Sequence, residues 1–178
     1  LHSTHIIDER FNHKFVLCLF NSKLFTFYYQ KTNSQGGDIF PQVRISSVEK
    51  LPIKLVGKNE QIPFIEKADL MLTLNLELPK LSQKFQHTIQ RKFNLEDLPG
   101  KLQNWYLLSY AEFITELAKK KVKLSLKEEA EWEVYFLEEA KQALELKSEI
   151  DKTDKEIGRM VYELYGLTVE AVGLVEGV

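Results

Sequence analysis

The sequence has 178 residues, of which 44% are hydrophobic and 28% are charged, and a formal net charge of −2. These are ordinary values for a soluble globular protein of one domain, or of one small domain with a helical extension. A single cysteine, Cys18, excludes a disulfide framework and a thiolate metal cluster, and we expect the protein to be cytoplasmic.

Neither a membrane span nor a signal peptide is expected. The longest apolar run, residues 15–20, is far shorter than the roughly 18 residues of a spanning helix, and charged residues interrupt the first ten positions. The chain begins with Leu1 inside a predicted strand, which we interpret as the start of a fragment of a longer protein.

Charge is unevenly distributed along the chain. Residues 1–62 hold eight Lys/Arg and five Asp/Glu, a net of +3, whereas residues 63–178 hold sixteen and twenty-one, a net of −5. Phosphate neutralisation supplies most of the affinity of nucleic-acid-binding proteins. We therefore expect any contact with DNA to lie in the first third of the chain and to be weak.

The first elements in chain order are a strand and two helices. Residues 4–7 are predicted to end a strand. Residues 10–30 carry aromatic and leucine side chains at helical spacing. Asn21-Ser22 is expected to break this stretch into two helices, because both residue types favour helix ends over helix interiors.

The next segment is predicted to be mostly non-helical. Gly36-Gly37 indicates a loop over residues 32–38, and Pro41 favours an extended segment over residues 40–45. Residues 46–49 have the pattern of a capping box that opens one helical turn.

From Pro63 onward the sequence predicts helices. Pro63 suits the first position of a helix, where its missing N–H costs nothing, and apolar residues then recur at helical steps. Pro79 is expected to kink or split this helix. Leu98-Pro99-Gly100 is expected to end it.

Two capping boxes follow. Ser109 and Glu112 predict a helix to about residue 121, and Ser125 and Glu128 open a helix of some forty residues that ends at Gly166. Thr168 is expected to cap a short final helix. A helix this long cannot bury its apolar stripe alone, so we expect it to pair with the helix that starts near residue 63.

The predicted fold class is α+β, mostly α. Residues 1–62 would form a small mixed α/β head, and residues 63–178 a helical body, in part an antiparallel coiled coil.

No catalytic constellation is found in the sequence. An adenine methyltransferase needs a Gly-rich cofactor loop and an Asn/Asp-Pro-Pro-aromatic loop, and none of the five prolines is adjacent to another. Glu145 and Lys147 have a nuclease-like spacing but fit a solvated helix face better. His2 and His5 are too few for a zinc site, and no metal site is expected.

The extended segment around residue 42 is a candidate for DNA contact. Gln42 and Arg44 would lie on one face of it, and Gln and Arg are the standard bidentate readers of bases. An edge strand whose polar residues face water explains the pattern equally well. Aromatic residues such as Trp105, Trp132 and Tyr135 fit helix packing better than base stacking.

The order of these segments resembles a known family. The segment "FVLCLFNSKLFTFYYQ", a Gly-Gly loop and "FPQVRISSVEKLPI" are similar to the end of a target-recognition domain, as in type I restriction specificity subunits and the TaqI-like C-terminal specificity domain. The remainder, which includes "PFIEKADLML" and "IDKTDKEIGRMVYELYGLT", resembles the C-terminus of type IIG restriction–modification enzymes. The most specific parts are residues 21–24, 51–53 and 162–168. Pro79, Gly158 and Ala171 depart from the family pattern.

The resemblance implies a non-catalytic DNA-recognition or spacer fragment of a site-specific adenine methyltransferase, with possible endonuclease activity upstream. S-adenosylmethionine and Mg²⁺ are expected for the parent enzyme, and no cofactor for this chain. The implied partners are double-stranded DNA and the upstream catalytic domains. Lys23, Gln42, Arg44 and Lys54, in the net-positive third, are the predicted DNA contacts.

Two alternatives remain open. The long helices could form a protein-interaction module that docks the parent's domains or makes a homodimer. The second alternative is that the chain is a stand-alone enzyme of another type.

Overall fold

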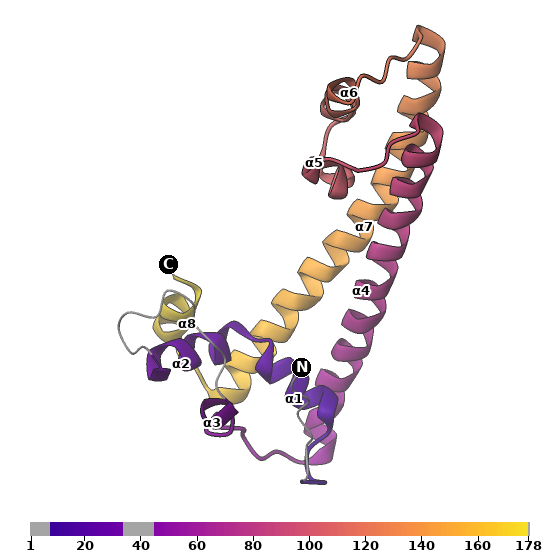
Figure 1. Cartoon of the computed structure of the whole chain (residues 1–178). Coiled ribbons are helices and arrows are strands. Elements are labelled where there is room, and N and C mark those ends of the chain that lie inside the picture. Colours follow the sequence, from indigo (N-terminus) through magenta and orange to yellow (C-terminus); the bar gives the residue numbers. More distant parts are fainter. Residues whose placement is uncertain (1–7, 34–44, 178) are drawn as a thin grey trace. The chain divides into compact units, whose positions relative to one another are not determined.

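The computed structural model describes residues 8–33 and 45–177, and within these ranges the regular elements are all helices (Figure 1). The mostly helical part of the predicted fold class is therefore confirmed. The mixed α/β head finds no support, because no strand occurs among the described residues. The strand predicted at residues 4–7 and nearly all of the extended segment at 40–45 lie outside the described ranges.

The chain divides into two compact units. Unit 1 comprises residues 1–71 and 153–178, and unit 2 comprises residues 72–152. The two longest helices, α4 (Lys58–Phe93) and α7 (Leu126–Tyr165), each contribute to both units. The predicted boundary after residue 62 falls inside α4 and stays a prediction.

Unit 1 begins with two short helices, α1 (His13–Phe20) and α2 (Lys23–Asn33). The predicted break at Asn21-Ser22 is confirmed. The Ser22 hydroxyl donates a hydrogen bond to the Leu19 backbone oxygen (2.6 Å) and accepts one from the Phe25 amide (3.3 Å), so it serves the helix ends on both sides.

A four-residue helix, α3 (Ile45–Val48), follows in the same unit. The one helical turn predicted here is confirmed, but it already includes Ile45 and Ser46, so Ser46 does not cap it as predicted. Ser46 lies within the turn that it was expected to open.

The core of unit 1 joins α1 and α2 to parts of the long helices. Phe15 and Phe64 meet edge to face, with ring centroids 5.2 Å apart, and Ile157 and Val161 of α7 belong to the same buried cluster. Gln61, 2% exposed, donates from Nε2 to the Arg10 backbone oxygen (2.8 Å), and its side-chain oxygen accepts from the Asn12 amide (2.8 Å). These bonds tie the segment before α1 to α4.

The ends of α4 differ from the prediction. The helix begins at Lys58 rather than Pro63, because the Glu60 carboxylate accepts a hydrogen bond from the Gly57 amide (2.8 Å) and so caps an earlier turn. Pro79 does not split it. It ends at Phe93 rather than at 98–100, because Asn94 adopts a left-handed conformation (φ 51°) and the Leu95 amide bonds the Gln90 oxygen (3.0 Å).

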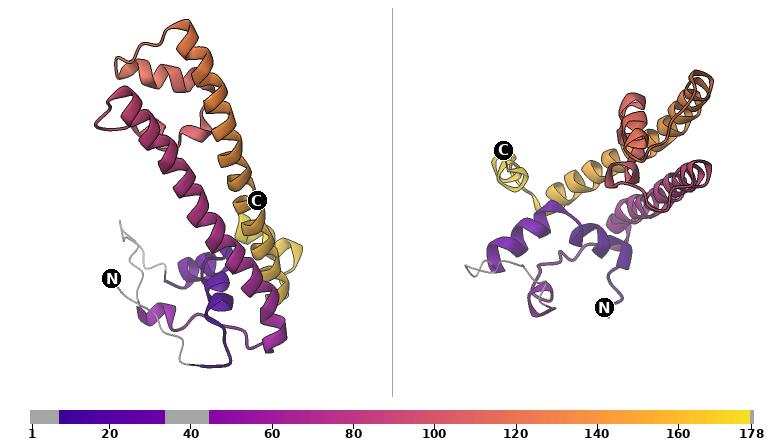
Figure 2. Two further views of the ribbon diagram at one scale, coloured as in Figure 1. Left: turned by 90° about the vertical axis from the view of Figure 1, so that its right-hand side faces the viewer. Right: turned by 45° about the horizontal axis from the view of Figure 1, so that its top comes forward.

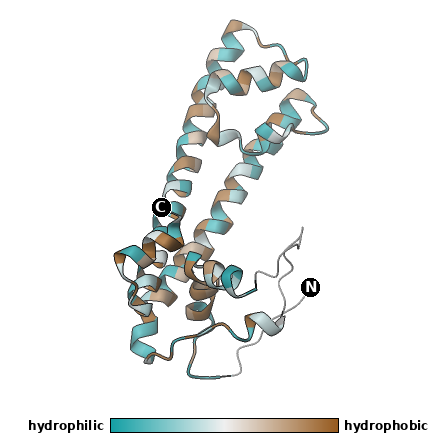
Figure 3. Cartoon of the chain, turned by 90° about the vertical axis from the view of Figure 1, so that its left-hand side faces the viewer, coloured by the Kyte–Doolittle hydropathy of each residue, from teal (hydrophilic) through white to brown (hydrophobic). Residues whose placement is uncertain are grey.

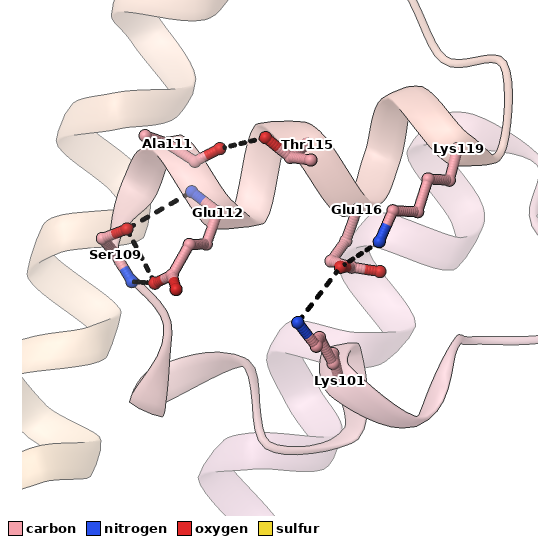
Figure 4. Close-up of polar contacts among 7 residues, drawn as sticks. All are labelled: Lys101, Ser109, Ala111, Glu112, Thr115, Glu116 and Lys119. Carbon is pink, nitrogen blue, oxygen red and sulfur yellow. Dashed lines mark hydrogen bonds and ion pairs between the residues drawn. The ribbon is translucent and has the colours of Figure 1, made fainter.

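In unit 2, three short elements connect α4 to α7: α5 (Gly100–Gln103), the 3₁₀ helix η1 (Trp105–Leu107) and α6 (Tyr110–Lys119). Both predicted capping boxes are confirmed. The Glu112 carboxylate accepts from the Ser109 amide (2.7 Å), as Figure 4 shows, and Glu128 accepts from the Ser125 amide (3.0 Å). Each serine in return accepts a hydrogen bond from the amide of its glutamate.

Aromatic rings dominate the core of unit 2. Phe85 of α4 stacks on Trp105 (3.7 Å between centroids) and meets Phe136 of α7 edge to face (6.0 Å). Phe113 of α6 stacks on Phe136 (4.8 Å). Figures 1 and 2 show α4 and α7 running through this unit with α5 and α6 beside them, and Phe93, late in α4, contacts Trp132, early in α7. The two segments are therefore antiparallel, and their apolar faces contribute to one core, as predicted.

The C-terminal end of the chain also follows the prediction. α7 has forty residues and ends at Tyr165, directly before Gly166, whose positive φ (65°) favours glycine. Thr168 caps α8 (Val169–Glu176) by accepting a hydrogen bond from the Ala171 amide (3.3 Å). The cap thus forms although Ala171 replaces the glutamate that would complete a capping box.

Candidate nucleic-acid interface

Two of the three most family-like segments, residues 51–53 and 162–168, meet in unit 1 at Tyr165. Its hydroxyl donates a hydrogen bond to the Pro52 backbone oxygen (2.6 Å) and accepts one from the Lys54 amide (3.1 Å). Its ring lies edge-on to Phe25 of α2, with centroids 5.9 Å apart. The last turn of α7 therefore holds the segment that leaves α3 and also packs against α2.

Lys54, one of the predicted DNA contacts, lies at this junction. Its side chain is exposed, and Nζ donates a hydrogen bond to the Leu164 backbone oxygen (2.6 Å). That carbonyl belongs to the last turn of α7, which carries partial negative charge and lacks a helical partner. Lys54 thus neutralises a helix end.

Lys23, the second described candidate, begins α2 and forms an ion pair with Glu176 of α8. Glu176 also accepts a hydrogen bond from the Tyr162 hydroxyl (2.5 Å). The hydrogen bonds from Lys23 and Tyr162 lower the pKa of Glu176 below its usual value, and burial together with Glu176 raises the pKa of Tyr162. The Lys23 side chain remains 61% exposed.

The remaining two candidates, Gln42 and Arg44, lie outside the described residues. Lys23 and Lys54 each contact the C-terminal segment of unit 1, but through different partners. No role was predicted from the sequence for Tyr162, Tyr165 or Glu176. The two tyrosines lie within residues 162–168. Their spacing of three, which places them on one face of a helix, was the feature of the sequence that could have indicated a shared role.

Residues that were weighed as catalytic groups and judged structural have the contacts of structural residues. Lys147 pairs with Asp151 on the surface of α7 (2.5 Å). Cys18 is 4% exposed, and its thiol donates to the Phe64 backbone oxygen (3.4 Å). Within the described ranges no three His, Cys, Asp or Glu side chains are grouped closely enough to hold a metal ion.

The aromatic residues of unit 2 are packing residues, as predicted. Trp105 is fully buried and its Nε1 donates to the Ser82 hydroxyl (3.2 Å), whereas Trp132 and Tyr135 pack on the rim of the same core. Of the helices in the described part of the chain, none combines the length and the apolar character that crossing a bilayer requires.

Two family models match the sequence. Residues 1–53 match the TaqI-like C-terminal specificity domain, which confirms the resemblance for the head. Residues 57–161, more than half of the chain, match a domain of unknown function, DUF8810. No curated protein and no solved structure shows a significant match. The chain therefore belongs to the DUF8810 family and carries, directly before that domain, a segment that matches the TaqI-like C-terminal specificity domain.

Proposed function

We propose that this chain is a non-catalytic DNA-recognition module of a type IIG restriction–modification enzyme, in which an adenine methyltransferase does the chemistry. The observation that carries the proposal is the match of residues 1–53 to a specificity domain. A specificity domain recognises DNA and leaves catalysis to other domains. S-adenosylmethionine and Mg²⁺ would be bound by those domains, and double-stranded DNA is the shared partner.

The proposed DNA contacts are Lys23, Gln42, Arg44 and Lys54, which belong to the net-positive third of the chain. The partners of Lys23 and Lys54 are compatible with this role. An exposed ion pair such as Lys23–Glu176 contributes little to stability, so a phosphate group can replace the carboxylate. Lys54 has three N–H donors and uses one of them on Leu164, which leaves two for phosphate oxygens.

The helical body has a supporting role in this proposal. Through Tyr165, the end of α7 fixes the segment from Pro52 to Lys54, and through Glu176, α8 fixes the start of α2. A module that reads DNA needs its contact residues held in a constant geometry. Unit 1 provides this by joining the specificity-like segment to the last helices of the chain.

The test is fluorescence anisotropy of the full chain with a labelled duplex, at several salt concentrations between about 50 and 200 mM. Lys23→Ala and Lys54→Ala should each weaken binding and reduce the slope of log Kobs against log[salt] by about 0.9. Lys127→Ala is the matched control, because Lys127 lies on α7 with its side chain 88% exposed. Unchanged binding by both head variants would contradict the proposed contacts.

Arg44 allows a sharper test, because it is proposed to read a base rather than only a phosphate. Arg44→Ala should then cost about 1–3 kcal/mol at one base position of the cognate site and little on a scrambled duplex. An equal loss on both duplexes would assign Arg44 to the phosphate backbone.

A second candidate function is self-association through α7. Val134, Leu137 and Leu144 follow one face of this helix and are 60%, 53% and 45% exposed. Figure 3 shows such apolar residues among polar ones along the long helices. Sedimentation velocity of the wild type and of Leu137→Glu/Leu144→Glu tests it. A concentration-dependent dimer that the variant lacks would support self-association, and a wild-type monomer would exclude it.

A further inference from the structure

The part of α4 that lies in unit 2 carries a row of basic side chains. Lys80, Lys84, His87 and Arg91 are spaced at four, three and four residues, and all four side chains are exposed. A rotation of 100° per residue places them within an arc of about 60°. Leu78, Phe85 and Ile89, which face the core, lie on the other side of the helix.

Charge is segregated between the two long helices of this unit. Residues 72–93 of α4 hold Lys80, Lys84, Arg91 and Lys92 against one acidic residue, Glu77, a net of +3. Residues 126–152 of α7 hold four lysines against nine Asp/Glu, a net of −5. The net charge of −5 over residues 63–178 therefore conceals a positive helix face.

The row lines a shallow hollow of about 930 Å³, together with Gln83, Thr88, Gln90 and Leu95. Gln83, His87 and Gln90 also line a second hollow of about 530 Å³, beside the segment that contains Gln103 and Asn104. Amide and imidazole side chains among cations supply hydrogen-bond donors for anionic oxygens. Acidic residues near this surface include Glu77 at its start, Asp97 in the second hollow and Glu139, which pairs with Lys84.

Few of these cations form ion pairs with other residues that the structure describes. Lys84 pairs with Glu139 at 3.5 Å and is still 68% exposed. Lys80 and Arg91 form no ion pair among the described residues. Ion pairing among the described residues therefore leaves most of the row's charge available to an external anion.

We propose that this row on α4 is a second contact surface for the phosphate backbone of duplex DNA, in the unit that lies outside the specificity-like segment. The choice of DNA rests on the proposed function. From Lys80 to Arg91 the helix rises roughly 16 Å. One strand of B-DNA winds around the axis, so a row of this length can follow its backbone over a few phosphates.

Such a surface positions the protein without reading sequence, because phosphate contacts carry no base information. It therefore differs from the contact proposed for Arg44. Loss of the row should weaken binding to cognate and scrambled duplexes equally.

The experiment compares two double variants of the full chain by anisotropy with both duplexes. Lys80→Gln/Arg91→Gln removes two charges from the row, and Lys127→Gln/Lys141→Gln removes two exposed charges from α7. The first should reduce the salt slope by about 1.8, which corresponds to two lost phosphate contacts, and the second should leave it unchanged. Circular dichroism checks that both variants keep their helices.

The outcomes separate this inference from the proposed function. If the α4 variant binds like the wild type while Lys23→Ala and Lys54→Ala weaken binding, the inference is wrong and the proposed contacts stand. If only the α4 variant weakens binding, the inference stands and the head contacts are wrong. A wild-type chain that binds neither duplex at about 50 mM salt overturns both. Equal losses by the α4 and α7 double variants also overturn the inference, because they indicate a general effect of charge.

Discussion

The Tyr165 hydroxyl donates a hydrogen bond to the Pro52 backbone oxygen at 2.6 Å, across 113 positions of the sequence. The hydroxyl oxygen of Tyr165 in turn accepts a hydrogen bond from the Lys54 amide (3.1 Å). Burial raises the pKa of Tyr165, so the hydroxyl keeps its proton and remains a donor at neutral pH. This contact joins the end of the specificity-like segment to the last turn of α7, four residues beyond the end of the DUF8810 match, within unit 1.

Tyr165→Phe should loosen this junction. The variant keeps the ring contact with Phe25 and removes both hydrogen bonds, so we expect a loss of about 1 kcal/mol in the free energy of unfolding. The most direct measurement is hydrogen exchange of the Lys54 amide, which should become faster. Tyr28→Phe is the control, because the Tyr28 side chain is exposed. Unchanged exchange at Lys54 would mean that the hydroxyl does not protect this amide.

Phe136→Ala should destabilise unit 2 by about 3–5 kcal/mol, the usual range for truncating a buried aromatic side chain. Phe136 is 1% exposed and contacts the rings of Phe85, Trp105 and Phe113. Denaturant unfolding followed by tryptophan fluorescence measures the loss, because both tryptophans of the chain lie in unit 2. Val134→Ala, on an exposed position of the same helix, should change the free energy by less than about 0.5 kcal/mol. Similar losses in the two variants would contradict the assigned core.

The sequence predicts the N-terminus of a helix well where a serine is followed by a glutamate three residues later. The boxes at Ser109 and Ser125 depend only on local hydrogen bonds, and both formed as expected. The box predicted at Ser46 did not form, because α3 already begins at Ile45. The start of α4 was missed for a related reason. Glu60 caps Gly57 without any serine or threonine, while Pro63 offered a stronger but later signal.

The candidate interface was less predictable, because it depends on contacts between distant segments. Periodicity identified the apolar stripe of α7 but could not indicate that Tyr165 meets Pro52. Net charge over a long segment also hid the basic row on α4, since averaging over residues 63–178 added the acidic residues of α7. A charge count for each helix face, rather than for each third of the chain, would have found Lys80, Lys84 and Arg91.

The two capping boxes of unit 2 should make its stability depend on acid pH. Hydrogen bonds from the Ser109 backbone and hydroxyl lower the pKa of Glu112, and those from Ser125 lower the pKa of Glu128, both from 4.5. A lowered folded-state pKa means that this stabilisation is present above about pH 4.5 and is lost as the pH falls through the folded-state values. Glu112→Gln/Glu128→Gln keeps hydrogen-bond acceptors that do not titrate. Its stability measured by urea unfolding should therefore fall less than that of the wild type between pH 6 and pH 3. Parallel pH profiles for the two proteins would show that the boxes do not contribute.

Cys18 should be unreactive in the folded chain. It is packed in the core of unit 1 with Phe15 and Phe64, and burial raises the pKa of its thiol from 9.0 to about 11. The thiolate is the reactive form, so a disulfide reagent such as Ellman's reagent should modify the native protein at pH 8 far more slowly than the chain in guanidinium chloride. Because the folded-state pKa is raised, the neutral thiol favours folding below about pH 9, and this contribution is lost as the pH rises toward 11. Cys18→Ala removes the titrating group, so its stability should decline less steeply than that of the wild type over this interval. Rapid modification of the native wild type, at the rate seen in denaturant, would mean that the core formed by α1 and α4 opens readily.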